Sequence, residues 1–211
     1  MPRVLLINAN TTRSVTDLLE HHARKATAGR VELKAVTAAF GAPYVTTEAA
    51  YAVAGHAALD ALERHAEGCD AVLLACFGDP GLFALREVSP VAVLGMAEAA
   101  MGEAAKHGRF SIVTGGPAWK PMLERLAAAL GFGDRLVNVN ALPLPGPELA
   151  NHLALIEDAI GAEKADCVII GGAALAGMAA RLQPAIRVPL IDSVACAALA
   201  AARLAETRMA A

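Results

Sequence analysis

Aromatic residues are scarce in this chain of 211 residues: they make up 4% of the sequence, although 56% of the residues are hydrophobic. Much of the apolar content is alanine, so the core must be packed from small and branched side chains. Lysine and arginine are spread along the chain, and the formal net charge is −3. Because binding to nucleic acid depends on clustered basic residues, we expect no nucleic-acid partner.

Long apolar segments are also lacking. The N-terminal run "RVLLIN" is short and has no cleavage pattern of a signal peptide. No other run is long enough for a membrane span, so we expect a soluble, cytoplasmic protein without a membrane partner. The length fits one or two modest domains.

Several motifs of known chemistry are missing as well. The four cysteines form no CxxC pair and no cluster with histidines at metal-ligand spacing, so we expect no metal. The glycine-rich signatures GxxxxGK[ST] and GxGxxG are absent, which argues against a bound nucleotide and leaves no cofactor to predict. A GxSxG elbow is also absent, so no serine hydrolase is indicated.

What the chain does contain is a regular alternation of short apolar runs with alanine-rich helical stretches. The runs predict strands at 3–9, 30–37, 71–76, 91–96, 109–116, 135–142, 167–172 and 188–192. The stretches between them predict helices at 13–28, 46–68, 81–89, 97–107, 117–130, 148–164, 173–186 and 193–208. Such alternation is typical of an α/β protein with parallel sheets flanked by helices.

The pattern restarts half-way along the chain. When "CDAVLLACFGDPGL" (69–82) is laid on "ADCVIIGGAALAGM" (165–178), Gly81 matches Gly177 and Cys76 matches Gly172. This repeat predicts two pseudo-symmetric lobes, each with a mainly parallel sheet. We assign residues 1–95 and about 190–211 to the N-terminal lobe and about 96–189 to the C-terminal lobe. An active-site cleft is expected between them, where the carboxyl ends of the strands face each other.

Four loops are expected to meet in this cleft: 8–12, 76–81, 114–117 and 171–177. They carry hydroxyl, amide and glycine residues but no lysine or arginine, which suits a small polar or anionic ligand held by backbone N–H groups. Structural roles are equally open. The residues of the first loop can cap a helix, the glycines can serve turn geometry, Asp79 can be a loop or capping residue, and Trp119 can belong to the core.

Cys76 differs from the other three cysteines by its place directly after a buried strand and before a glycine-rich turn. A free cysteine has a pKa of about 8.5, and a helix N-terminus or turn N–H groups can lower it. Loop 77–81 offers both, so a reactive thiolate is one interpretation and a passive wall residue is the other. Cys69, Cys167 and Cys196 are interpreted as buried apolar residues.

Several motifs together resemble the aspartate/glutamate racemase superfamily, most closely its hydantoin and allantoin racemase branch. They are "INANTT" (7–12), "GAPYVTTEAAYAVAGHA" (41–57), "CFGDPGL" (76–82), "GGAALAGM" (171–178) and "VPLIDSVA" (188–195). The resemblance implies cofactor-independent proton transfer at a carbon next to a carbonyl in a small amide- or carboxylate-bearing compound. In that family two cysteines, one from each half, face the substrate from opposite sides.

Matched by motif, Cys76 is the first catalytic cysteine. The resemblance places substrate-binding residues at Asn8, Asn10, Thr11, Phe77, Gly78, Asp79, Thr114, Gly115, Gly116, Gly172 and Ala173. Together with the alanine-rich helices, it also favours a homo-oligomer.

Gly172 is the main departure, because the family has its second cysteine at this position. Another group or a water molecule can serve the second face, which leaves a racemase or epimerase. One cysteine alone can support a decarboxylase, as in the related arylmalonate decarboxylase, or attack an unsaturated substrate in a cis–trans isomerase. A cysteine-dependent hydrolase and a non-catalytic binding protein for small molecules also remain open.

Overall fold

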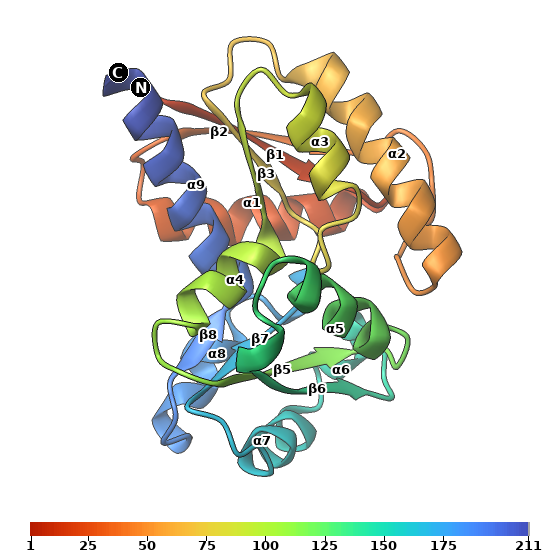
Figure 1. The fold of residues 1–211 in the computed structure, drawn as a ribbon, viewed down its shortest axis with the longest axis vertical. Coiled ribbons are helices and arrows are strands. Elements are labelled where there is room, and N and C mark those ends of the chain that lie inside the picture. Colours follow the sequence, from red (N-terminus) through yellow and green to blue (C-terminus); the bar gives the residue numbers. More distant parts are fainter. Residues whose placement is uncertain (211) are drawn as a thin grey trace.

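The computed structural model describes residues 1–210 and contains two four-stranded parallel sheets (Figure 1). The first has the order β2-β1-β3-β4 and is built from β1 (Arg3–Asn8), β2 (Glu32–Thr37), β3 (Ala71–Leu74) and β4 (Ala92–Gly95). The second has the order β6-β5-β7-β8 and is built from β5 (Phe110–Gly115), β6 (Leu136–Leu142), β7 (Cys167–Ile170) and β8 (Leu190–Asp192). The α/β prediction with two matching sheets is therefore confirmed.

Helices connect and cover the strands. They are α1 (Arg13–Thr27), α2 (Glu48–His65), α3 (Leu82–Val88), α4 (Met96–Ala104), α5 (Trp119–Ala129), α6 (Gly146–Leu149), α7 (Leu153–Gly161), α8 (Met178–Leu182) and α9 (Ser193–Ala210). Short 3₁₀ turns occupy Gly133–Arg135, Ala173–Leu175 and Gln183–Ala185. Within residues 1–210, none of these helices has the length and apolar character needed to traverse a bilayer.

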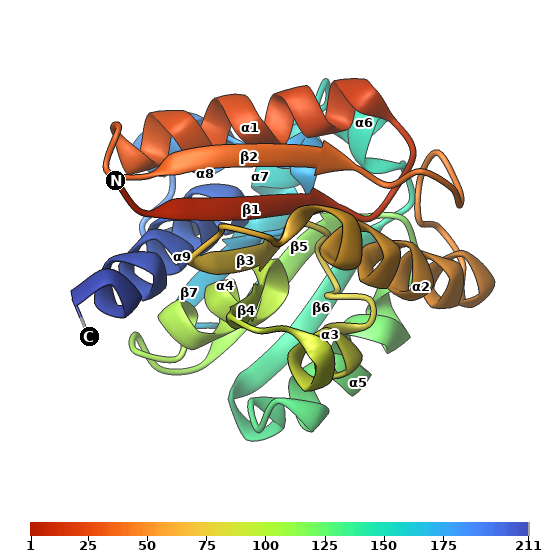
Figure 2. The ribbon, with the colours of Figure 1, turned by 90° about the horizontal axis from the view of Figure 1, so that it is seen from above.

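Alternate residues of each central strand face opposite layers of helices. In β1, Leu6 packs in the cluster that contains α1, α4 and α9, whereas Leu5 packs in the cluster of α2 and α3. Figure 2 shows α1 running alongside β2 and β1. Burial on both faces explains why these strands are continuous apolar runs in the sequence.

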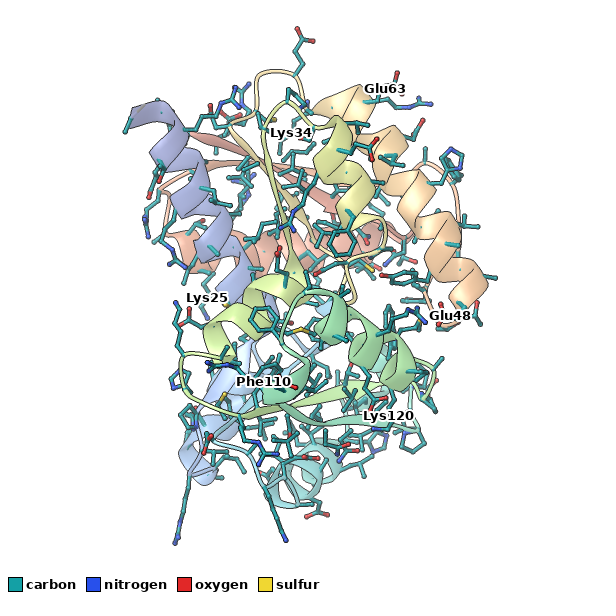
Figure 3. All side chains as sticks on the ribbon, in the orientation of Figure 1. Lys25, Lys34, Glu48, Glu63, Phe110 and Lys120 are labelled. Carbon is teal, nitrogen blue, oxygen red and sulfur yellow. The ribbon has the colours of Figure 1, made fainter. Side chains whose placement is uncertain are left out.

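One buried cluster joins the two sheets. It contains Leu73 of the first sheet, Phe110 and Ile169 of the second, and the inner faces of α4 and α9. Figure 3 shows Phe110 inside the second half of the molecule, below α4. We call the first sheet with its flanking helices the first lobe, and the second sheet with its flanking helices the second lobe. Strand β8 belongs to the second sheet, and α9, which begins at Ser193, packs back against α1 and β3.

The two lobes also match in detail at their third strands. Cys76 is the second residue after the end of β3, and Gly172 is the second residue after the end of β7. In each loop, a glycine with a left-handed backbone conformation directly precedes the next helix: Gly81 with φ 78° and Gly177 with φ 81°. The internal repeat in the sequence thus places Cys76 and Gly172 at equivalent points.

Two predicted helices are interrupted in the structure. The single helix expected over 148–164 is two helices, α6 and α7, because His152 has φ −114° and ψ 64°, outside the helical region. The helix expected over 173–186 is reduced to α8 between two 3₁₀ turns. Gly177 with its positive φ precedes α8, and Pro184, which cannot continue a helical hydrogen-bond ladder, lies in the turn that follows it.

Candidate active site

A cavity of about 720 Å³ lies where the carboxyl ends of the two sheets meet. All four loops expected to form the cleft contribute to its wall. Of the predicted site residues, those that line it are Asn10, Cys76, Phe77, Thr114, Gly115, Gly116, Gly172 and Ala173. The remaining wall is formed by Val15, Tyr44, Val45, Thr46, Ala75, Pro117, Ala118, Trp119, Pro143, Pro145, Glu148, Gly171, Ala174 and Leu175.

Asn8 lies one layer behind the cavity and supports Asn10. Its buried side-chain amide donates to Asn10 Oδ1 at 3.0 Å and to Thr16 Oγ1 at 3.0 Å. Asn10 Oδ1 also accepts from the backbone N–H of Thr12 at 2.9 Å, just before α1 begins. Asn8 therefore positions a cavity residue and ties the loop to the first helix.

Thr11 connects the first loop to a segment that lies outside the four predicted loops. Its backbone N–H donates to the carbonyl of Ala42 at 3.1 Å, and the hydroxyl of Thr12 donates to the carbonyl of Pro43 at 2.6 Å. The same segment brings Tyr44, Val45 and Thr46 to the cavity wall. This segment follows β2. Because ligands in such sheets bind beyond the carboxyl ends of the strands, its position after a predicted strand could have identified it as part of the site.

The turn that carries Cys76 is held from both lobes. Tyr51 of α2 donates its hydroxyl to the carbonyl of Gly78 at 2.7 Å. The ring of Trp119 lies so close to Gly78 that a Cβ added there would stand 2.3 Å from the ring atom Cζ3. Gly78, at φ 127°, is therefore required for the contact. Trp119, for which a place in the core was left open, is half-buried: it packs against the core clusters and also lines the cavity.

A second contact between the lobes lies near the same end of α2. Arg125 of α5 donates to both carboxylate oxygens of Glu48, at 2.9 and 3.0 Å. Figure 3 shows Glu48 where the start of α2 approaches α5. This exposed pair joins the segment that carries Thr46 to the helix that carries Trp119.

Asp79 is buried and caps a helix rather than lining the cavity. Its carboxylate accepts the backbone N–H groups of Ala97 at 2.9 Å and Glu98 at 2.8 Å, in the first turn of α4. A Cβ on Gly95 would lie 2.1 Å from Oδ2, so the absence of a side chain at Gly95 makes room for the carboxylate. Of the two roles left open for Asp79, the structure shows the capping role.

Burial raises the pKa of Asp79 to about 7, even though the N–H groups of α4 act to lower it. The folded protein then keeps this proton up to about pH 7, whereas the unfolded chain loses it near the ordinary value of 3.8. Because the folded state binds more protons in this window, the contribution of Asp79 to stability falls as the pH rises through it.

Asp79→Asn is therefore expected to be most destabilising at low pH. The substitution loses one capping bond, which costs on the order of 1 kcal/mol, but removes the pH-dependent penalty. We expect the difference in unfolding free energy between wild type and variant, measured with urea, to be larger at pH 5 than at pH 8. A difference that stays the same from pH 5 to pH 8 would mean that the pKa of Asp79 is not raised, and would contradict this interpretation.

Cys76 itself is 8% exposed. Burial, with a smaller contribution from the charge of Asp79, raises the pKa of its thiol to about 12. A lowered thiol pKa, one of the two interpretations that the sequence left open, is therefore not what the structure shows: within residues 1–210 no N–H donates to Sγ, and α3 begins only at Leu82. The thiol is protonated at neutral pH in this structure, and Cys69, Cys167 and Cys196 all lie outside the cavity.

Gly172 leaves open space on the wall of the second lobe. A Cβ added there would have one neighbour within 4 Å, Thr114 Oγ1 at 3.7 Å. Next to it, the ring of Phe77 lies against Gly171, where an added Cβ would be 2.2 Å from Cε1. The loops of Cys76 and Gly172 are thus in direct contact, and both residues face one cavity.

These features agree with comparisons to known proteins. The Asp/Glu/Hydantoin racemase family profile matches residues 4–201. The chain belongs to the Asp/Glu/hydantoin racemase family. Over 215 residues it is 31% identical to a hydantoin racemase of Pseudomonas sp. (strain NS671), and the match covers 97% of this chain and 85% of the relative.

Solved structures of this family have the same architecture. An allantoin racemase from Klebsiella pneumoniae superposes with a TM-score of 0.89 at 31% identity, covering 100% of this chain and 88% of that one. An allantoin racemase from Pseudomonas fluorescens gives 0.90 at 28% identity, covering 97% and 91%. The predicted isomerase class is thereby confirmed, whereas the homo-oligomer and the cytoplasmic location stay predictions.

The wall of the racemase cavity is almost uncharged. Its lining contains no lysine, arginine or histidine, and Glu148 is its one carboxylate, counted over the described residues 1–210. Several backbone N–H groups of the wall, among them those of Phe77, Ala173 and Ala174, have no acceptor in the same part of the chain. Phe77 belongs to the first lobe and Ala173 and Ala174 to the second, so donors are available from both sides of the cavity.

The described residues contain no cluster of three or more histidine, cysteine, aspartate or glutamate side chains that could hold a metal ion. The groups in the cavity that can exchange protons are the thiol of Cys76, the phenol of Tyr44 and the carboxyl group of Glu148. The site can therefore bind a neutral, partly apolar molecule and move a proton to or from it.

Proposed function

We propose that this protein racemises a small, uncharged cyclic amide of the 5-substituted hydantoin type, with Cys76 as an acid/base residue and without a cofactor. The observation that carries the proposal is the cavity itself, which joins the Cys76 thiol to a wall without cationic side chains. The loop N–H groups suit one anionic group, but a free aspartate or glutamate carries two carboxylates. Within residues 1–210 the wall has no cationic side chain to balance the second one, and burying it unpaired is costly. The similarity to curated hydantoin racemases supports the same substrate class.

The apolar part of the wall supports a substrate with a sizeable side chain. Val15, Val45, Trp119 and Leu175 line the cavity, and its volume of about 720 Å³ lies within the range of ordinary ligand pockets. A ring amide can use the unpaired N–H groups of Phe77 and Ala173 through its carbonyl oxygens. The apolar wall then remains for the substituent on the carbon that changes configuration.

Racemisation at this carbon needs one proton removed and one returned. To act as the base, Cys76 must first give up the proton that its buried thiol carries in the structure. The thiolate then takes the proton next to the carbonyl, so the C–H bond breaks, an S–H bond forms, and the electron pair moves onto the carbonyl oxygen. Backbone N–H groups that point at this oxygen stabilise the enolate as its charge develops. A proton delivered to the opposite face then forms the new C–H bond and yields the other enantiomer.

Gly172 favours a second candidate, one-sided proton transfer by Cys76 alone. Among residues 1–210, the lobe opposite Cys76 contributes no thiol to the cavity, so a proton removed by Cys76 can return to the same face. Such an enzyme would exchange the proton with solvent while keeping the configuration, or would protonate an enolate formed by decarboxylation.

Proton NMR in D₂O together with optical rotation tests the proposal. We expect single enantiomers of 5-substituted hydantoins to lose both their α-proton signal and their rotation, at rates above the reaction without enzyme. Aspartate and glutamate should stay unchanged, since the wall built by residues 1–210 has no cationic side chain to balance their second carboxylate. Exchange with retained rotation would favour one-sided transfer, loss of CO₂ from arylmalonates would favour decarboxylation, and racemised aspartate would contradict the proposed substrate class.

A further inference from the structure

We propose that Glu148 exchanges the proton on the substrate face opposite Cys76, in the place that a second cysteine would fill. This inference rests on the proposed racemisation, because only a reaction at both faces needs a second acid. It assigns a function to the one carboxylate in the cavity wall of the described chain.

The position of Glu148 in the fold supports this role. Helix α6 packs against the turn Ala173–Leu175, which directly follows Gly172 in the second lobe. Glu148 therefore reaches the cavity from the lobe opposite Cys76. The lack of a side chain at Gly172 leaves the space between open, with Thr114 Oγ1 as the single atom within 4 Å of an added Cβ.

The other polar groups of the wall fit this role less well. The Thr114 hydroxyl already donates to the carbonyl of Gly171 at 2.9 Å, and a hydroxyl is a poor acid. Tyr44 belongs to the segment after β2, in the lobe of Cys76. Glu148 makes no side-chain hydrogen bond or ion pair with any residue of the described range 1–210, so its carboxyl group is not engaged elsewhere.

The two groups form a complementary pair. Burial keeps the shared proton on Cys76 between turnovers. For the enantiomer whose proton faces Glu148, the carboxylate takes that proton and the Cys76 thiol returns one to the opposite face, leaving a thiolate and a carboxylic acid. For the other enantiomer, the resting pair first moves its proton from Cys76 to Glu148; the thiolate then takes the substrate proton and the carboxylic acid returns one, which restores the resting state. The pair carries one proton throughout, so no oxidant, reductant or further reactant is needed.

Exchange measured separately for each enantiomer of 5-benzylhydantoin tests the inference. We expect Glu148→Gln to lower racemisation by about 10²-fold or more. The enantiomer whose proton faces Cys76 should still exchange it in D₂O with retained rotation, and the other should not exchange. Glu157→Gln on α7, outside the cavity, is the matched control and should racemise both enantiomers as the wild type does.

Circular dichroism in D₂O gives a second readout. A wild-type enzyme with two different proton-exchanging groups shows an overshoot of the signal before it settles at zero, since the product carries deuterium. The inference is overturned if Glu148→Gln racemises at the wild-type rate, or if it loses exchange of both enantiomers equally. A wild-type protein that exchanges one enantiomer without racemising it would instead overturn the proposed function and the inference with it.

Discussion

Cys76→Ala is expected to lower kcat/KM for racemisation by at least about 10³-fold while the protein stays folded. Sγ is the one sulfur atom in the cavity wall of the described chain, and the proposed reaction uses it to take the proton from one face of the substrate. The substitution removes a single atom beside a cavity, so little packing is lost. Racemisation followed by optical rotation, with thermal unfolding of the same samples, checks both parts of the prediction.

Cys196→Ala is the matched control for this experiment. Cys196 lies in α9, its thiol donates to the carbonyl of Ala99 at 3.5 Å, and it does not line the cavity. We expect this variant to racemise hydantoins at nearly the wild-type rate. A folded Cys76→Ala variant that keeps its activity would exclude Cys76 as an acid/base residue, whatever happens at Cys196.

The fold could be predicted from the sequence because each strand carries its own signal. Runs such as "AVLLAC" and "CVIIGG" are apolar throughout, as strands covered on both faces must be, and turn residues mark their ends. The repeat of these runs pairs Cys76 with Gly172, and the two residues do lie at equivalent points of the two lobes. The helix boundaries failed at 173–186, where the break depends on the left-handed backbone of Gly177.

The chemistry of Cys76 could not be predicted in the same way. A sequence shows that a turn and a helix follow the cysteine, but its pKa depends on what covers it. Burial by the surrounding side chains and the neighbouring charge of Asp79 raise this pKa, whereas no N–H group of the described chain reaches the sulfur. Long-range packing therefore raises the pKa of the Cys76 thiol, whereas its position before a turn and a helix had suggested that the pKa could be lowered.

Glu148 was missed for a related reason. The sequence pattern puts it at the start of one long helix, where a glutamate is an ordinary surface residue. It reaches the cavity because the chain turns between α6 and α7, so that α6 lies against the Ala173–Leu175 turn. Tyr44 and Val45 were missed although they follow a predicted strand. Their loop is long and has no glycine-rich turn at the strand end that would mark it in the sequence. Contacts such as the hydrogen bond from Thr11 to Ala42 bring this loop back to the cavity.

The effect of a thiol at Gly172 follows from the same geometry. Gly172→Cys is expected to restore racemisation by about 10²-fold when it is added to Glu148→Gln, because the new side chain puts an acid on the face that this variant has lost. The added Cβ meets only Thr114 Oγ1, at 3.7 Å, so space is available. The backbone at φ 116° is unfavourable for any side chain, and we expect a loss of stability on the order of 1–3 kcal/mol.

Gly172→Ser, also added to Glu148→Gln, distinguishes the effect of a new acidic group from the effect of backbone strain at this position. Serine brings the same Cβ and the same backbone penalty, but its hydroxyl is a far weaker acid than a thiol. Both double variants should therefore melt at similar temperatures, while only the cysteine variant racemises both enantiomers. Equal racemisation by the two would mean that added bulk, not a second thiol, changes the reaction. A folded cysteine variant without racemisation would show that the position matching Cys76 in the repeat does not face the reacting carbon.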